Sequence, residues 1–145
     1  MGSARTRHYR ASHGVDEWIT GFDRGLRTLT GIHQAARPNP AEDVAEADLT
    51  AQERSHVAGL MRVNHTGEVC AQALYEGQAL MASDTNAKAS LMSAAAEEQD
   101  HLVWCRSRLR ELDARPSLLD PVFFGLSFAM GAAAAPKKSC PALRI

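Results

Sequence analysis

Three residues near the middle of the chain are of types that bind metal ions: Glu68, Glu98 and His101. His101 follows Glu98 by three residues, so on a helix the imidazole and the carboxylate share one face. Glu68 lies fifteen residues before Ser83, and Glu98 lies fifteen residues after it. A helical hairpin that turns at Ser83 would place both carboxylates at one level, about 22 Å from the turn. Two carboxylates and one imidazole are half of the ligand set with which four-helix bundles hold two iron ions.

The residues around Glu98 predict that its side chain faces the protein interior. Apolar residues recur at helical spacing on both sides of it, which is typical of a buried helix face. They are Leu91, Ala94, Ala95, Leu102, Cys105, Leu109 and Leu112. A buried carboxylate is costly without a positive partner, and a divalent metal held with His101 is one such partner. An ion pair with Arg62, Arg106 or Arg108 is the alternative, and the residues alone leave both open.

Two further features bear on the metal ligands. Glu53 and His56 repeat the Glu-x-x-His spacing, but Thr50 and Glu53 also form a capping box, which assigns Glu53 to a helix start. Around Glu68 the helical face is more polar and includes Asn64, Gln72 and Tyr75, which we interpret as groups that orient the ligands. We therefore predict metal ligands at Glu68, Glu98 and His101 only, and no catalytic residue beyond them.

Length and composition favour a single all-α domain. The chain has 145 residues, a net charge of −1, 45% hydrophobic residues and only 6% aromatic residues. A charge this close to zero gives no reason to expect a nucleic-acid partner. No segment shows the alternation of a strand, and the many alanines favour helices. The fold class we predict is a ferritin-like helical bundle, of which this chain holds the first half.

Three widely spaced cysteines indicate a reducing compartment. Cys70, Cys105 and Cys140 include no Cys-x-x-Cys pair and are odd in number, so neither a zinc site nor a disulfide framework is indicated. We interpret Cys105 as a small core residue.

The pattern divides the chain into three parts. Residues 1–48 hold a basic start, an amphipathic helix and a proline-rich linker; residues 49–135 hold the half-bundle; residues 136–145 form an unstructured tail. The amphipathic helix has an apolar stripe and a stop at Gly31. The stripe comprises Val15, Trp18, Ile19, Phe22, Leu26 and Leu29. It would either pack across the bundle or lie on a membrane surface.

Three more helices are predicted in the half-bundle. They run from about residue 50 to 81, from about 86 to 112 and from 121 to 135, the last with Asp120 as its N-cap and Pro121 in its first turn. The third contains no charge, but fifteen residues are too few to cross the roughly 30 Å hydrocarbon layer. It is therefore expected to be buried or interfacial.

Several longer motifs are similar to one known family. The chain resembles the demethoxyubiquinone hydroxylases of ubiquinone biosynthesis, and the resemblance covers about half of it, from roughly Thr50 to Gly131. The matching segments are Leu60 to Val69, Ala73 to Gln78, Glu98 to Leu102, Arg115 to Ser117 and Phe128 to Gly131.

This resemblance implies a role for each candidate ligand. Glu68 would be a terminal ligand of one iron ion, Glu98 would bridge two iron ions, and His101 would be the nitrogen ligand of the first. His65 would be structural. The implied activity is an O2-dependent monooxygenase that hydroxylates the ring of a polyprenyl demethoxyubiquinol, with two irons per complete site and NADH or a related electron donor.

The second half of the family's ligand set has no counterpart here, because no Glu follows Glu111 and no His follows His101. We therefore expect a C-terminally truncated family member that holds half of a di-iron site. The alternative is a homodimeric, half-ferritin-like protein that binds or oxidises iron, and a third hypothesis is a metal-free helical interaction module. The expected location is the cytoplasmic side of the cell membrane, as a peripheral protein, or else the matrix side of the mitochondrial inner membrane.

Overall fold

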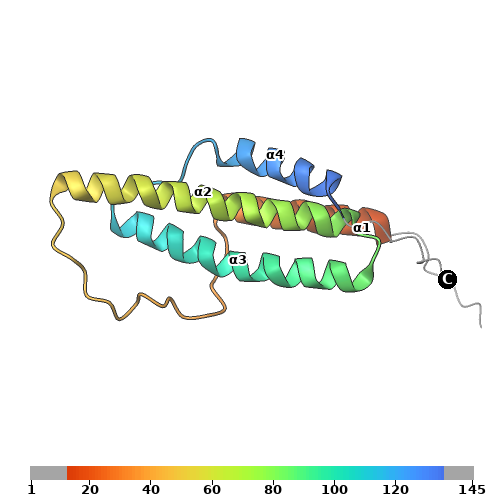
Figure 1. Ribbon diagram of the computed structural model, residues 1–145, viewed down its shortest axis with the longest axis horizontal. Helices are drawn as coiled ribbons and strands as arrows, with labels where there is room; N and C mark the ends of the chain where they lie inside the picture. The colour runs from red at the N-terminus through yellow and green to blue at the C-terminus, as the bar shows by residue number, and fades with distance from the viewer. Residues whose placement is uncertain (1–12, 136–145) are drawn as a thin grey trace, which may run out of the picture.

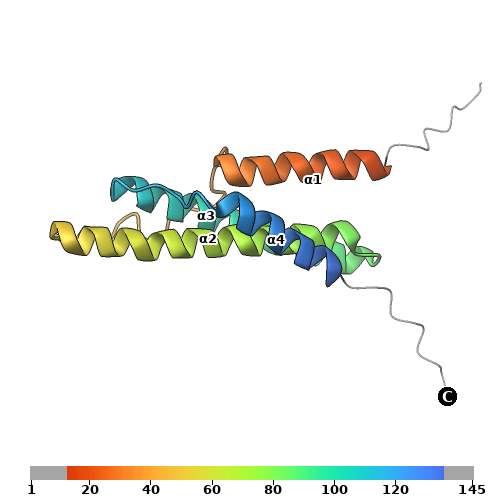
Figure 2. The same cartoon turned by 90° about the horizontal axis from the view of Figure 1, so that it is seen from above.

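The computed structural model describes residues 13–135 and consists, within that range, of four helices and no strand. These are α1 (His13–Thr30), α2 (Ala51–Met81), α3 (Thr85–Glu111) and α4 (Asp120–Ala133). Helices α2 and α3 form a long antiparallel hairpin, and α4 lies against α2 on the side away from α3 (Figure 1). Helix α1 runs alongside α2, as the view from above shows (Figure 2). The predicted all-α class is confirmed.

The two helices of the hairpin begin at side-chain caps. The backbone N–H of Glu53 donates to Thr50 Oγ1, and the Thr50 N–H donates to Glu53 Oε2 at 2.9 Å, so the predicted capping box is present. At the start of α3 the Ala87 N–H donates to Asp84 Oδ1 at 2.8 Å. The turn therefore falls where the sequence placed it.

The start of α4 differs from the prediction by one residue. Leu119 is the N-cap and makes no side-chain cap, whereas Asp120 is already helical. The Asp120 carboxylate accepts a hydrogen bond from Thr66 Oγ1 at 2.7 Å and is buried. The prediction of Asp120 as the N-cap was wrong because this side chain is directed to α2, where it contacts Thr66 and His65.

Two glycines let α2 and α4 approach at backbone distance. A Cβ atom at Gly131 would lie 2.2 Å from the carbonyl oxygen of Leu74, and one at Gly77 would lie 2.3 Å from that of Phe128. Such distances are far shorter than a van der Waals contact, so neither position has room for a side chain. The pair of glycines therefore sets how closely α4 packs on the hairpin.

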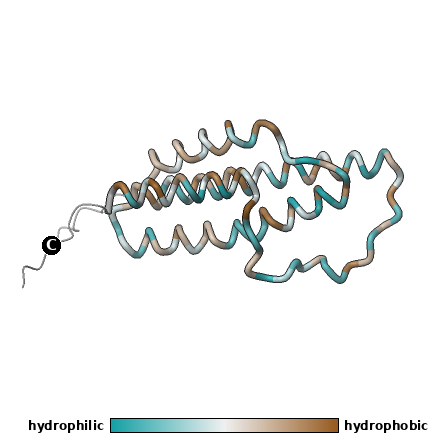
Figure 3. Tube along the Cα trace, turned by 180° about the vertical axis from the view of Figure 1, so that it is seen from behind, coloured by the Kyte–Doolittle hydropathy of each residue, from teal (hydrophilic) through white to brown (hydrophobic). Residues whose placement is uncertain are grey.

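Helix α1 turns its apolar stripe outward. It ends, as predicted, before Gly31, whose φ is 75°. Five residues of the stripe are exposed, with Phe22 70% and Trp18 59% accessible. Among the α1 residues from 18 to 30, Gly25 and Thr28 are buried, on the face that packs against α2 and α4. The helix thus packs on the bundle, which was one of the two predicted alternatives, but through this face and not through the apolar stripe. Figure 3 shows hydrophobic and hydrophilic residues interspersed along the helix.

Residues 1–12 and 136–145, which include the predicted basic start and the predicted tail, lie outside the described residues. The three-part division of the chain stays a prediction. No helix in the range 13–135 is both long enough and apolar enough to cross a membrane.

Candidate metal centre

The structure brings Glu68, Glu98 and His101 together at the seam between α2 and α3. One ligand atom from each lies within 4.8 Å of the other two. His101 Nδ1 is 3.0 Å from Glu98 Oε2 and 3.7 Å from Glu68 Oε2. The predicted convergence of two carboxylates and an imidazole is thus observed, and their function as metal ligands stays a prediction.

Packing of the hairpin determines where these side chains point. On α3 the buried residues Ala95, Leu102 and Leu109 face α2, and Glu98 lies on the edge of that same face. The side chains of Glu68, Glu98 and His101 are 27%, 20% and 41% exposed. The cluster is therefore partly sheltered but open to solvent along one side, which an ion could use to enter.

Electrostatics at the seam favour a bound cation. Burial raises the pKa of Glu68 to about 7, and the neighbouring Glu98 adds to this through a hydrogen bond and its charge, against the opposing effect of His101. Two carboxylates that face each other hold a proton in place of a second negative charge. A divalent ion would neutralise both, and carboxylate with imidazole is a donor set that suits iron. The residues present thus fit the metal that the sequence led us to expect.

The arginines proposed as alternative partners bind elsewhere. Arg62 donates to the Arg115 carbonyl, and Arg108 forms ion pairs with Glu46 and Glu111. Arg106 donates to the carbonyl oxygens of Thr28 and Leu29, at the end of α1. Over residues 13–135 no arginine forms an ion pair with Glu68 or Glu98, so the ion-pair alternative was wrong.

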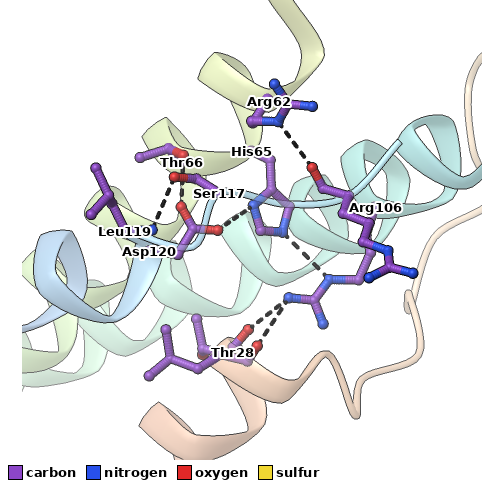
Figure 4. A network of polar contacts seen from close by, with 10 residues as sticks. Thr28, Arg62, His65, Thr66, Arg106, Ser117, Leu119 and Asp120 are labelled. Atoms are coloured by element: carbon purple, nitrogen blue, oxygen red, sulfur yellow. Dashed lines mark hydrogen bonds and ion pairs between the residues drawn. The ribbon is translucent and has the colours of Figure 1, made fainter. Parts of the chain in front are cut away.

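His65, expected to be structural, lies in a separate buried network that joins all four helices (Figure 4). Its Nδ1 is 3.1 Å from Asp120 Oδ2, and its Nε2 accepts a hydrogen bond from Arg106 Nε at 3.4 Å. Burial lowers the pKa of His65 and the charge of Arg106 lowers it further, whereas Asp120 opposes both effects. The ring connects a carboxylate on α4 to a guanidinium on α3.

The second Glu-x-x-His pair takes no part in the cluster. Glu53 caps α2, and His56 is exposed. Gln72, interpreted as orienting the ligands, instead donates its amide to Glu76 Oε1 at 2.8 Å. That interpretation was wrong, since Gln72 and Glu76 are one helical turn apart on a buried face of α2 and pair with each other.

Sequence reasoning missed two residues, Trp104 beside the cluster and the buried Glu76 elsewhere on α2. Glu76 is only 2% exposed, and its Oε2 has no hydrogen-bond partner. Trp104 packs its ring 5.4 Å from that of His101. The spacing could have found both, because Trp104 follows His101 by three residues and Glu76 follows Gln72 by four.

The fold and the seam define a class: a helical hairpin that carries a carboxylate and histidine cluster of the kind that di-iron bundles use. The family follows from sequence comparison. The family model described as ubiquinone biosynthesis protein COQ7 matches residues 55–138, more than half of the chain. The chain belongs to this family.

Curated relatives agree with this assignment. The chain is 58% identical over 121 residues to the 3-demethoxyubiquinol 3-hydroxylase of Burkholderia cenocepacia, a match that covers 83% of the chain and 58% of the relative. It is 57% identical over 129 residues to the enzyme of that name from Acinetobacter baylyi, covering 88% of the chain and 59% of the relative. The matches thus span less than two thirds of each relative. No solved structure matches the chain.

Proposed function

We propose that this chain supplies iron ligands to a 3-demethoxyubiquinol hydroxylase. Glu68, Glu98 and His101 would hold ferrous iron, and bound iron would supply the redox chemistry that activates O2. The observation that carries the proposal is the convergence of these three donors within 4.8 Å, with no arginine in the described residues to neutralise them.

The reaction is a monooxygenation of the quinol ring. One oxygen atom of O2 replaces a ring hydrogen as a hydroxyl group, and the other leaves as water after two electrons and two protons are delivered. NADH or a related donor would supply the electrons. The names of the relatives support this substrate.

The chain's own residues would position the donors. The Glu98 carboxylate orients the imidazole of His101, because its Oε2 lies 3.0 Å from Nδ1. The Trp104 ring packs beside that imidazole and limits its rotation. These contacts exist before any ion binds, so they lower the cost of assembling the site.

The exposed apolar face of α1 supports a peripheral membrane location, on the cytoplasmic side of the cell membrane or, alternatively, the matrix side of the mitochondrial inner membrane. Trp18, Ile19 and Phe22 form an outward stripe, and α4 exposes Leu126 and Met130. Apolar helix faces of this kind bind in the interfacial layer of a bilayer. A polyprenyl substrate would be reached from that layer.

The partial exposure of the cluster favours a second candidate, the half-ferritin-like homodimer. All three donors come from one hairpin, and the imidazole of His101 is 41% exposed. Two copies that face each other would supply two sets of these three donors, which could form one shared site on a twofold axis. A dimer mass together with two irons per dimer, and no quinol hydroxylation, would favour this candidate.

The two Glu-x-x-His pairs of α2 and α3 provide a matched test of the proposed function. Purified chain is loaded with ferrous iron under anaerobic conditions, and iron per chain is measured. Quinol, NADH and O2 are then added, and hydroxylated quinol is measured by mass spectrometry. His101→Ala is expected to lose more than nine tenths of both, whereas His56→Ala retains them, since His56 is exposed and lies outside the cluster. Equal iron loading in the two variants would contradict the proposal.

A further inference from the structure

A groove runs beside the metal cluster, between the hairpin and the linker that joins α1 to α2. Its volume is about 920 Å³. We call the part of the linker that forms one wall the strap, residues 35–49. The apolar lining comes from the strap, from α2 and from α3. It includes Val44, Leu49, Val57, Met61, Val103 and Trp104.

Polar contacts clamp the strap at two points, so the groove is a built feature of the fold. At one end the Ala36 N–H and Arg37 Nε both donate to the buried Asp100 carboxylate at 2.7 Å. Nearer the other end Arg108 Nη2 donates to Glu46 Oε1 at 2.7 Å. The lining of the groove therefore includes the charged residues Arg37, Glu46 and Arg108 as well as the apolar ones.

One end of the groove adjoins the metal cluster. Trp104 lines the groove and packs against His101, with ring centroids 5.4 Å apart. Cys105 also lines it, and Glu68 is near enough that its charge, after burial, raises the pKa of the Cys105 thiol. The Arg37 guanidinium of the strap lies 5.6 Å from the centroid of the Trp104 ring, so both the strap and His101 contact this ring.

The other end lies near Glu111, seven residues along α3 from Trp104. At 1.5 Å per residue this is a length of about 10 Å. One isoprene unit adds four bonds to the extended tail, a length of about 4.5 Å, so the length of the groove matches about two isoprene units. Its apolar lining would shelter hydrocarbon, and its volume is in the range of small-molecule sites.

We propose that this groove holds the first two isoprene units of a polyprenyl quinol, with the ring at the Trp104 end beside the cluster. The inference rests on the proposed function, because it takes the substrate class from there. It assigns to the strap the task of binding the tail, and it makes Trp104 a contact of the ring.

Binding can be measured through Trp104 itself. The chain has two tryptophans, so Trp18→Phe leaves Trp104 as the one reporter, and bound quinones quench indole fluorescence. The probes are the oxidised demethoxyubiquinone ring without a tail and the same ring with two isoprene units. We expect the tailed probe to bind at least tenfold more tightly than the bare ring.

Charged substitutions in the groove test where the tail lies. In the Trp18→Phe background, Leu49→Asp and Val57→Asp are expected to reduce the gain from the tail to less than threefold. Val44→Asp is a second strap variant whose side chain is already 70% exposed, so the fold tolerates the change. The matched control is Val63→Asp on α2, which is equally exposed at 70% and does not line the groove.

Two results would overturn the groove assignment. The first is that the tailed probe still binds at least tenfold more tightly than the bare ring in all three groove variants. The second is that the two probes bind equally tightly to the parent, as expected if a second copy or another segment covers the groove. Failure of the proposed function would look different. Iron loading and hydroxylation would then be absent while the tail gain still depended on Leu49 and Val57.

Discussion

His101 Nδ1 lies 3.7 Å from Glu68 Oε2, across the seam between α3 and α2. This contact joins α3, which carries the Glu98 and His101 pair, to α2, which carries the single carboxylate of Glu68. Because α3 brings Glu98 to the same point, three donors meet without help from the rest of the chain. The hairpin by itself therefore holds the three residues that we propose as iron ligands.

The neighbouring residues Glu97 and Glu98 give a matched pair for the metal assignment. Glu98→Ala removes a donor of the cluster, so iron loading under anaerobic conditions is expected to fall by at least tenfold. Helix content by circular dichroism should stay the same, since Ala favours helix and Glu98 is at the edge of the core. Glu97 is exposed and outside the cluster, so Glu97→Ala should load iron normally. Normal loading by Glu98→Ala would refute the ligand assignment.

Glu76 should make the protein less stable as the pH rises. Burial raises the pKa of this carboxyl above its usual 4.5, against the opposing effects of Gln72 and Arg24. Between the unfolded and folded pKa values the native state holds more protons, so stability falls as pH increases through that window. The Arg24 guanidinium offsets little of this, because it is 3.9 Å away and its side chain is 36% exposed.

Glu76→Gln is therefore expected to raise the melting temperature at pH 7 and to leave it nearly unchanged at pH 4. The amide of Gln could also donate to Gln72 Oε1, which is buried without a partner. Melting curves from pH 4 to pH 8 measure this, with exposed Glu97→Gln as the control. A variant less stable than the parent at pH 7 would show that the ion pair with Arg24 dominates.

Asp120 holds the buried network together. Asp120→Ala removes the acceptor of the Thr66 hydroxyl and the carboxylate that faces His65. The cost should be about 3 kcal/mol, because the Thr66 hydroxyl and the buried His65 ring both lose the carboxylate that they contact. Urea unfolding measures it, and Asp43→Ala in the exposed linker should change stability by less than about 0.5 kcal/mol. A loss no larger than in that control would show that the network contributes little to the free energy of unfolding.

Two glycines of α4 should respond in opposite directions to alanine. Gly131→Ala must push α4 away from α2, because the new methyl would lie 2.2 Å from the Leu74 carbonyl oxygen. We expect a loss of about 2 kcal/mol in the free energy of unfolding. At Gly125 nothing lies within 4 Å of an added Cβ, so Gly125→Ala should gain about 1 kcal/mol from helix propensity. Equal effects at both sites would contradict the close packing of α2 and α4.

Much of this protein follows from its sequence alone. The bounds of the hairpin follow from local signals, namely the capping box at Thr50, the turn at Ser83 and the apolar periodicity of α3. Because an α-helix has a constant rise, equal distances from one turn also brought Glu68 and Glu98 to the same level. These properties depend on residues close together in the chain, which is why they could be predicted.

Only the tertiary structure decided which faces meet. It turned the apolar stripe of α1 outward and directed Arg106 to the end of α1 instead of to the cluster. It also buried Glu76 and clamped the strap over α3 through Asp100. Each of these depends on pairing between residues far apart in sequence, where several partners of the right chemistry compete. Periodicity shows that a face exists, but the packing of whole helices selects what that face contacts.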